Sequence, residues 1–328
     1  MRRILLFAIQ QSVIVILTLA AIEIFLRVAD FRDLRLGRNE LTLPYAYDAE
    51  LGWFPVPNTT SLFAGQASNT ARTIHVQNNS LGLRDIEPES GSKPTILVLG
   101  DSYVWGYDVE ADERLTEFLR RRLPDHRIVN AGVSGYGTDQ EYLLLRRLWD
   151  GLRPEVVILV TFYNDHQDNS GNYGYWAYKP YFQVSPAGGE FRGQPVPRSR
   201  YLRFRDSWWA ENLFFVRLAI SVYVEFSDRK VNIPDPTEHL IRMMRDFVEA
   251  RGAKFVIGEL DGKTMVNFFS AERIPYVSLE GAPDRPDLHY QVADGLGHWN
   301  PAGQAAAGAK ILSLLVENGV VRSAANDR

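Results

Sequence analysis

Residues 95–106 have the sequence TILVLGDSYVWG, an apolar run of strand length that ends in a glycine and a polar turn. A run that is apolar on both faces is typical of a strand buried inside a parallel sheet. Similar runs follow at 126–132 (HRIVNAG), 154–162 (PEVVILVTF) and 254–260 (KFVIGEL), and a shorter one lies near Tyr276. We therefore predict a mostly parallel sheet that contains these strands.

Amphipathic segments of helical length separate the predicted strands. Their apolar residues recur with helical spacing, and Asn300-Pro301 has the form of an N-cap followed by proline at the first helical position. The predicted helices cover residues 113–123, 138–149, 236–250, 263–272 and 301–317. Strands and helices that alternate in this way predict an α/β fold with a three-layer, doubly wound, flavodoxin-like sheet.

The composition restricts the classes of function. The chain has 328 residues, of which 45% are hydrophobic and 23% charged, as in an ordinary globular protein. Its net charge is −4 and it has no long run of Lys or Arg, so we expect no nucleic-acid partner. It contains no cysteine, which excludes disulfides, thiolate nucleophiles and cysteine-ligated metal sites. We predict neither a cofactor nor a metal ion.

Residues 4–26 (ILLFAIQQSVIVILTLAAIEIFL) form a long apolar segment at the start of the chain. As a helix this segment is about 34 Å long, enough to cross a hydrocarbon core of about 30 Å. Two glutamines and Glu23 interrupt it, and the small residues at 18–21 offer a cleavage site for a signal peptide. A retained membrane anchor, a cleaved signal peptide and a buried helix are the alternatives. We favour the anchor, because apolar residues continue as far as Val28.

The sequence divides into three parts. Residues 1–30 are the predicted anchor, and residues 31–92 form a charged tether followed by an accessory region with short β-like pieces. The α/β domain is expected at 93–328. Residues 166–234 break its alternation of strands and helices and are rich in Tyr, Trp, Gly and Pro, so we interpret them as an insertion.

Polar and small residues follow the predicted strands, where open α/β sheets bind their ligands. Ser102 follows the first strand, a glycine-rich loop at 131–137 the second, and Asn164 the third. Asp294 and His298 come after the last short strand. These segments together supply a nucleophile, oxyanion donors and a base, which is the set of groups that acyl transfer requires.

Four segments in this order resemble the sequence blocks of the SGNH (GDSL-type) hydrolase superfamily. They are VLGDSYVWG (98–106), NAGVSGYGTDQ (130–140), TFYNDH (161–166) and DGLGHWNPAG (294–303). The resemblance covers about residues 95–318 and implies an SGNH-hydrolase fold for the α/β domain. The anchor, the NSLGLRD segment at 79–85 and the GYGTDQE segment also resemble a bacterial membrane-anchored branch of this superfamily, related to exopolysaccharide O-acetylation proteins.

The resemblance implies a catalytic triad of Ser102, His298 and Asp294, with Ser102 as the nucleophile and His298 as its base. The chain departs from the family pattern in two ways. Residue 103 is Tyr where the family name has Leu, and Asp294 and His298 lie four positions apart where the family has three. Asp287 is therefore an alternative to Asp294, and a Ser–His dyad oriented by a backbone carbonyl is another.

The oxyanion hole implied by the resemblance consists of the backbone N–H groups of Ser102 and Gly135 and the side-chain amide of Asn164. Gly132 and Gly137 are alternatives to Gly135 in the same loop. Each residue type also has an ordinary structural interpretation, because serine caps helices, glycine forms turns and asparagine forms Asx-turns.

Several further residues near these segments have two interpretations. The aromatic residues that either line an acyl or sugar site or pack in the core are Trp105, Tyr136, Tyr163 and Trp299. Asp101 is expected to stabilise its loop as a hydrogen-bond acceptor. Asp165, His166 and Asp168 lie so close together in one loop that we do not expect them to form a full set of metal ligands.

We therefore predict a serine esterase or acyltransferase that acts on O-acyl esters, above all on O-acetyl esters. Its substrate is expected to be an acylated small molecule or a cell-surface polysaccharide. The alternative is a non-catalytic membrane-anchored subunit that uses the same fold to bind glycans or proteins. Either protein is compatible with a place in a membrane protein complex.

Two conflicting signals bear on the orientation of the body. Arg2 and Arg3 precede the apolar segment and four arginines follow it between Arg27 and Arg38, so the positive-inside count favours a cytoplasmic body. The resemblance to exported polysaccharide-modifying proteins favours a periplasmic or extracellular body. We expect an exported body that residues 4–26 attach to the cell membrane.

Overall fold

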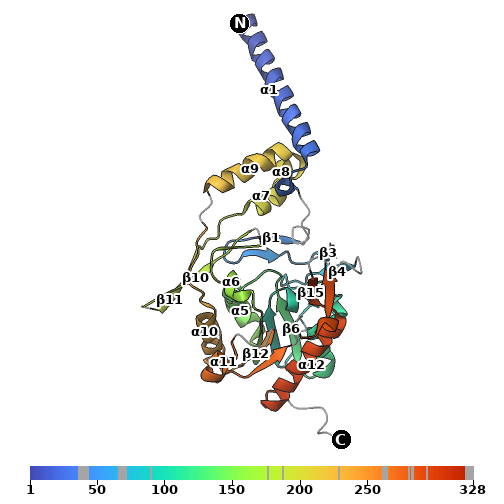
Figure 1. Ribbon diagram of the computed structural model, residues 1–328, viewed down its shortest axis with the longest axis vertical. Helices are drawn as coiled ribbons and strands as arrows, with labels where there is room; N and C mark the ends of the chain where they lie inside the picture. The colour runs from blue at the N-terminus through green and yellow to red at the C-terminus, as the bar shows by residue number, and fades with distance from the viewer. Residues whose placement is uncertain are drawn as a thin grey trace.

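The computed structural model describes most of the chain. The described residues are 1–35, 44–65, 72–88, 91–175, 177–186, 188–227, 230–260, 265–279, 281, 284–292 and 295–321. The centre of the protein is a five-stranded sheet with helices on both sides, and a long N-terminal helix projects from one end (Figure 1).

All neighbouring strands of the central sheet are parallel. In chain order the strands are β5 (Thr95–Gly100), β6 (Arg127–Gly132), β7 (Val156–Thr161), β12 (Lys254–Leu260) and β13 (Tyr276–Leu279). Their order across the sheet is β13-β12-β7-β5-β6. This is the flavodoxin-like order, in which the direction of winding reverses between β5 and β7. The predicted doubly wound sheet is confirmed.

Alternate residues of each strand pack against opposite helical layers. Leu97 and Leu99 of β5 belong to one apolar cluster, and Ile96 and Val98 belong to the other. The first layer contains α5 (Thr138–Leu152), α10 (Thr237–Glu249) and α11 (Val266–Glu272), and the second contains α4 (Leu115–Arg122) and α12 (Pro301–Glu317). The predicted three-layer arrangement is thus confirmed, and α5 extends one turn beyond its predicted end.

The region before the sheet forms two antiparallel hairpins. They are β1 (Tyr45–Asp48) with β2 (Gly52–Pro55), and β3 (Thr60–Ala64) with β4 (Thr73–Gln77). Trp53 and Phe63 are buried in the same apolar cluster as Leu97 and Leu99 of β5. The accessory region therefore shares the core of the α/β domain.

The segment expected to be an insertion contains two hairpins and several short helices. These elements are α6 (Asp165–Asp168), β8 (Tyr173–Gly174), β9 (Ala177–Tyr178), β10 (Tyr181–Ser185), β11 (Gly188–Arg192), α7 (Arg200–Asp206), α8 (Trp208–Asn212) and α9 (Phe214–Ser227). Figure 1 shows α7, α8 and α9 at the end of the body from which the N-terminal helix projects.

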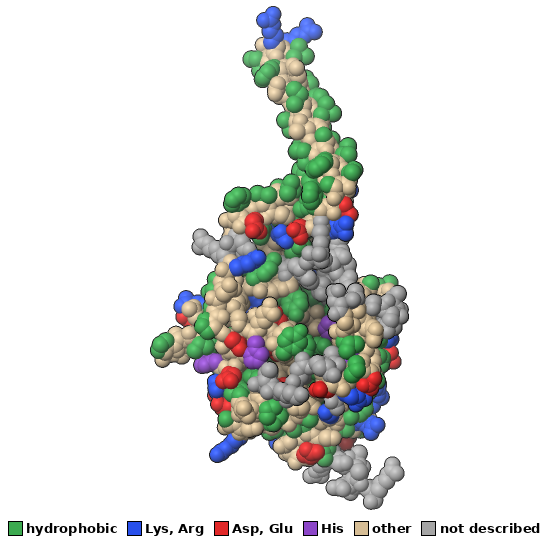
Figure 2. Space-filling model, in the orientation of Figure 1, with side chains coloured by type: hydrophobic (Ala, Val, Ile, Leu, Met, Phe, Trp, Pro, Cys, Tyr) green, Lys and Arg blue, Asp and Glu red, His purple; other side chains and the backbone are tan. Residues whose placement is uncertain are grey.

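The N-terminal helix α1 (Arg2–Ala29) carries hydrophobic side chains along its length (Figure 2). Among the described residues it is the one helix that is long and apolar enough to cross a membrane, a property that it shares with signal sequences. The predicted apolar helix is confirmed, and it continues three residues past Leu26. A short 3-10 turn, Arg32–Leu34, follows it.

Candidate active site

Ser102 is the first residue of α3 (Ser102–Trp105), a short helix that directly follows β5. Asp101 caps this helix, because its side chain accepts a hydrogen bond from the N–H of Tyr103 at 2.9 Å. The expected loop-stabilising role of Asp101 is confirmed. Since β5 and β7 are neighbours, Ser102 lies where the winding of the sheet reverses, the usual ligand position in open α/β sheets.

The side chains of Ser102 and His298 are in direct contact. Ser102 Oγ lies 2.7 Å from His298 Nε2, although 196 positions separate the two residues in the sequence. His298 belongs to β15 (Gly295–Trp299), which pairs with β14 (His289–Val292) in an antiparallel hairpin. Asn300 then caps α12 through its side chain, as predicted. A serine hydroxyl bonded to an imidazole is the arrangement in which the imidazole can remove the hydroxyl proton.

Two buried tyrosine rings pack against the imidazole of His298. The ring of Tyr107 stacks on it with a centroid distance of 4.3 Å, and the ring of Tyr103 contacts it at 4.7 Å. Burial lowers the pKa of His298 to about 3, and the neighbouring His289 adds to this effect. The imidazole is therefore neutral at pH 7.

The acidic residue of the predicted triad, Asp294, lies outside the described residues. The alternative acid, Asp287, pairs with Arg285 at 2.6 Å, and its side chain is mostly exposed. His289 lies in the same hairpin as His298, with its Nδ1 2.8 Å from the carbonyl oxygen of Gly297. Of the predicted triad, the described residues are thus Ser102 and His298.

The glycine-rich loop after β6 lies against α3 and against the accessory region. Gly132 permits a close approach, since a Cβ at this position would lie 2.3 Å from the backbone nitrogen of Trp105. Gly137 caps α5. Gly135 has a φ of +83°, in the left-handed region that favours glycine, and a Cβ there would lie 3.4 Å from the ring of Trp53. The accessory region therefore supports the loop that carries the predicted backbone donor.

Asn164 follows β7, and its side-chain amide donates to two acceptors. Nδ2 donates to Asp168 Oδ2 at 2.8 Å and to the hydroxyl of Tyr175 at 3.2 Å. The ring of Tyr175 covers Gly135, because a Cβ on that glycine would lie 3.0 Å from the ring. One tyrosine side chain thus reaches from Gly135 to Asn164, the two predicted donors that lie outside α3.

Five carboxyl groups surround the base of this site. They are Asp101, Asp139, Glu141, Asp165 and Asp168. Burial raises the pKa of Asp101 to about 7 and that of Asp168 to about 6. Burial also raises the pKa of Glu141, and repulsion from Asp165 adds to the rise. Lys179 from the insertion forms a fully buried ion pair with Asp139.

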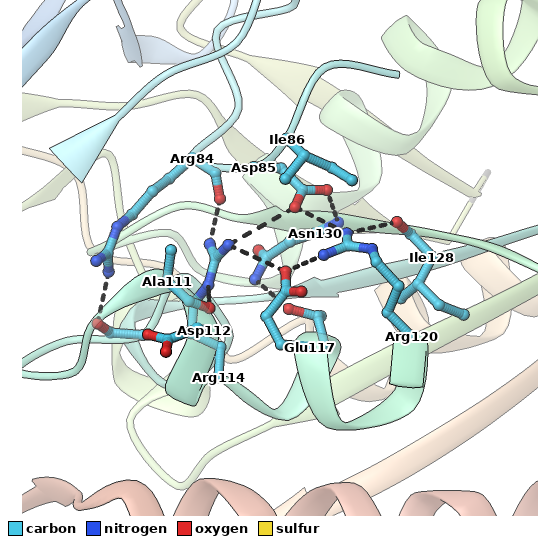
Figure 3. Close-up of polar contacts among 12 residues, drawn as sticks. Arg84, Asp85, Ile86, Ala111, Asp112, Arg114, Glu117, Arg120, Ile128 and Asn130 are labelled. Carbon is cyan, nitrogen blue, oxygen red and sulfur yellow. Dashed lines mark hydrogen bonds and ion pairs between the residues drawn. The ribbon is translucent and has the colours of Figure 1, made fainter. Parts of the chain in front are cut away.

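Arg84 and Asp85 of the accessory region brace the segment that follows the nucleophile. The buried guanidinium of Arg84 donates to three carbonyl oxygens within residues 105–109, at 2.7 to 3.1 Å. Asp85 accepts hydrogen bonds from the backbone N–H of Asn130 and from Arg120, both at 2.9 Å (Figure 3). These contacts link the accessory region to both the nucleophile segment and the glycine-rich strand end.

The structure separates the aromatic residues that had two interpretations. Trp105, Tyr136 and Trp299 are fully buried and pack in the core, whereas Tyr163 is largely exposed. The aromatic residues that do contact the site are Tyr103, Tyr107 and Tyr175. The sequence did not point to these roles. Its one relevant signal is an aromatic content of 12%, which identifies no position.

The residues considered as metal ligands have other partners. Asp165 accepts a hydrogen bond from the N–H of Phe162 at 3.0 Å, His166 pairs with Asp235 at 2.6 Å, and Asp168 binds the Asn164 amide. Within the part of the chain that the structure describes, no group of three His, Asp or Glu side chains has the arrangement of a metal site.

No family model and no curated protein matches the chain. Several solved structures are similar to the chain. They include a lipolytic protein of the G-D-S-L family from Desulfitobacterium hafniense (12% identity, TM-score 0.39), the psychrotrophic esterase EstA from Pseudoalteromonas sp. (12%, 0.36) and an acetyl-xylooligosaccharide esterase from Geobacillus (13%, 0.35).

These matches cover 67%, 69% and 69% of this chain and 99%, 99% and 95% of the matched chains, respectively. The functional assignment rests on the contact between Ser102 and His298 and on the residues around it.

Proposed function

We propose that the protein is a serine ester hydrolase of the SGNH type, with Ser102 as the nucleophile and His298 as the general base. The observation that carries this proposal is the 2.7 Å contact between Ser102 Oγ and His298 Nε2 at the point where the winding of the sheet reverses. A serine that only begins a helix does not require an imidazole against its hydroxyl. The neighbouring Asn164 and the glycine-rich loop supply groups that can act as oxyanion donors beside this pair.

The reaction begins when Ser102 Oγ attacks the ester carbonyl carbon and His298 Nε2 takes the hydroxyl proton. The N–H groups of Ser102 and Gly135 and the Asn164 amide stabilise the resulting oxyanion. The ester C–O bond then breaks, and His298 gives its proton to the leaving alcohol. Water attacks the acyl-enzyme with His298 again as base, and Ser102 leaves with the proton restored.

The Asn164 amide must exchange one acceptor to take this role. Its nitrogen carries two hydrogens, and Asp168 accepts one of them and orients the amide. The hydroxyl of Tyr175 accepts from the same nitrogen, and a substrate carbonyl oxygen replaces it when the ester binds. In this proposal Tyr175 moves aside during each turnover.

An O-acetylated sugar is the substrate that we propose. A cavity of about 540 Å³ lies beside Asn164, and its lining includes Gln167, Tyr173, Tyr175 and Lys230. Hydrogen-bonding groups around aromatic rings suit a ring with several hydroxyl groups. In this proposal the sugar occupies the cavity while its acetyl ester reaches Ser102. The acyl-enzyme then transfers its acetyl group to water or to a second sugar hydroxyl.

We also propose that α1 is retained as a single-pass anchor and that the body lies outside the cytoplasm. Arg2 and Arg3 before the span favour a cytoplasmic N-terminal side, although the arginines after the span oppose export. Fusions of alkaline phosphatase and of green fluorescent protein to the C-terminus test the orientation in a bacterial host. An active phosphatase with a dark fluorescent fusion supports export, and the opposite pair of results excludes an extracellular substrate.

A fluorophosphonate probe tests the proposed chemistry directly, because it reacts with an activated serine. We expect the probe to label the full-length protein at Ser102, and we expect His298→Ala to lose the label. The acetate released from acetylated oligosaccharides, compared with the acetylated acceptor formed, distinguishes hydrolysis from transfer. The alternative of a non-catalytic binding subunit predicts neither labelling nor acetate release.

A further inference from the structure

Helix α9 is apolar on both sides, because Val216 and Ile220 pack against the body while other apolar residues face away from it. Leu218, Val222 and Phe226 recur every four positions and therefore lie on one side of the helix. Their side chains are 38%, 46% and 90% exposed, whereas Arg217 and Val224 of the same helix are buried. A surface helix of a water-soluble protein carries polar residues on the side opposite its core-facing apolar stripe, whereas the outer side of α9 is apolar too.

Exposed aromatic residues extend this apolar side. Trp208 and Trp209 of α8 are 63% and 62% exposed, and Tyr223 of α9 is also exposed. Together with Leu218, Val222 and Phe226 they form what we call the α8–α9 face. A contiguous exposed apolar surface marks a contact with a membrane or another protein, and Trp and Tyr are the residues that gather where lipid headgroups meet acyl chains.

Direct hydrogen bonds connect this face to α1. The carboxylate of Glu23 accepts from the backbone N–H groups of Phe214 and Phe215 at 3.1 and 3.0 Å, which satisfies the first turn of α9. Arg27 donates to the carbonyl oxygen of Asn212 at 2.6 Å. The start of α9 is therefore held beside Glu23.

The position of Glu23 in the sequence sets the level of α9 relative to a membrane. The apolar part of α1 before Glu23, residues 4–22, is about 28 Å long as a helix, close to the thickness of a hydrocarbon core. Glu23 then lies at the boundary with water, and α9 lies there with it. Figure 1 shows α9 lying across the end of α1, and Figure 2 shows hydrophobic side chains on this edge of the body.

We propose that the α8–α9 face lies in the interface of the same lipid bilayer that α1 crosses. This inference rests on the proposed retention of α1 as an anchor. The continuity of the face with α1 selects lipid as the partner in preference to a second copy of the chain or another protein. A spanning helix and an interfacial helix together hold the body in one orientation to the membrane, which a single spanning helix on a tether does not.

Quenching of tryptophan fluorescence by brominated lipid tests this inference on the full-length protein. The chain is reconstituted into phosphatidylcholine vesicles with and without bromine near the top of the acyl chains. We expect the bromine to quench part of the emission, and Trp208→Phe/Trp209→Phe to remove most of the quenched part. Trp149→Phe, on α5, is the matched control and should leave the quenched part unchanged. Quenching that persists in the double variant overturns the inference.

A second pair of variants places new reporters in the Trp208→Phe/Trp209→Phe background. Phe226→Trp should restore quenching, whereas Ser313→Trp, at an exposed position on α12 at the far end of the body, should not. Vesicle flotation distinguishes a failure of the proposed anchor from a failure of the proposed interfacial face. A chain that fails to float overturns the anchor and the interfacial face together. A Phe226→Trp chain that floats but shows no restored quenching overturns the interfacial face alone.

Discussion

We call the edge of the parallel sheet where Ser102 contacts His298 and Asn164 follows β7 the rim. The rim and the insertion at 166–234 use aromatic residues in opposite ways. At the rim, Tyr103 and Tyr107 are buried around His298 and keep its imidazole neutral. In the insertion, Trp208 and Phe226 are exposed on the side away from the core. Burial at the rim sets the state of a reacting group, whereas exposure in the insertion leaves apolar surface for an external contact. We therefore expect substitutions at the rim to change turnover by orders of magnitude and substitutions in the insertion to change it by small factors.

The largest effect is expected from Ser102→Ala. This change removes the nucleophile, so turnover of a short ester such as p-nitrophenyl acetate should fall by about 10⁴-fold or more. The far-UV circular dichroism spectrum should stay the same, because Ser102 only begins α3 and Asp101 caps it. Unchanged esterase activity in this variant would show that Ser102 is not the nucleophile.

His298→Ala and Asp294→Ala test how the rim orients its base. His298 contacts Ser102 directly, so His298→Ala should lower kcat by about 10⁴-fold. The unusual spacing of Asp294 and His298 and the packing of two tyrosine rings against the imidazole predict a much smaller loss for Asp294→Ala, below about 10²-fold. Equal losses of about 10³-fold or more in the two variants would show that Asp294 is a full member of a triad.

Asn164→Ala tests the side-chain donor of the rim. Loss of one oxyanion donor costs about 10² to 10³-fold in kcat, with little change in KM. Asp168→Asn keeps the size of the side chain that orients the Asn164 amide and weakens the hydrogen bond, so it should cost less. An Asn164→Ala variant that retains wild-type kcat would restrict this residue to a structural role.

The sequence predicts the rim much better than the insertion, and the reason is physical. Each strand of the sheet is a short apolar run, and burial on both faces demands that composition wherever a parallel strand occurs. The residues after β5 and β7 are therefore placed by the strands, and Ser102 and Asn164 could be singled out from the sequence alone.

The contacts of Tyr175 depend instead on tertiary structure. It has a left-handed φ of +47° near the turn of the β8–β9 hairpin, and it reaches Asn164 from a segment without a strand or helix pattern. The outward apolar side of α9 was equally hidden, since an apolar stripe in a sequence is ordinarily assigned to the core. Periodicity identifies such a stripe, and only the packing of the neighbouring elements shows which way it faces.

Tyr175→Phe changes a residue of the insertion, and its expected effect on kcat/KM is small. The effect is also opposite in direction to those above, because kcat/KM should rise. The hydroxyl of Tyr175 occupies the Asn164 amide in the free protein, and a neutral hydrogen bond is worth about 1 kcal/mol. Its removal should therefore raise kcat/KM about fivefold, while the phenyl ring still covers Gly135. A fall in kcat/KM in the Phe variant would instead assign the hydroxyl to substrate binding. Tyr181→Phe, on β10 and outside the lining of the proposed sugar cavity, is the matched control.

The smallest effect is expected where the two regions meet, beside the buried pair of Asp139 and Lys179. Glu141 lies one turn from the start of α5, and both of its carboxyl oxygens are buried and accept no hydrogen bond from the described residues. Burial raises its pKa well above 4.5, so the folded protein keeps this proton while the unfolded chain releases it. The stabilising contribution of the protonated carboxyl is complete below about pH 4.5 and declines as the pH rises toward the pKa in the folded state.

Glu141→Gln keeps the shape of the side chain and cannot ionise. The variant and the wild type should therefore unfold at similar temperatures near pH 4.5, and the variant should be the more stable at pH 8. Each kcal/mol of the difference corresponds to about 2–4 °C in Tm. Glu249→Gln, at an exposed position on α10, is the control for loss of a carboxylate and should not change the pH dependence. If the difference in Tm between Glu141→Gln and the wild type stayed constant from pH 4.5 to 8, the Glu141 carboxyl would have to be ionised in the folded protein. The five buried carboxyl groups near Ser102 would then include an ionised Glu141, and Lys179 of the insertion would be the nearby positive charge that stabilises them.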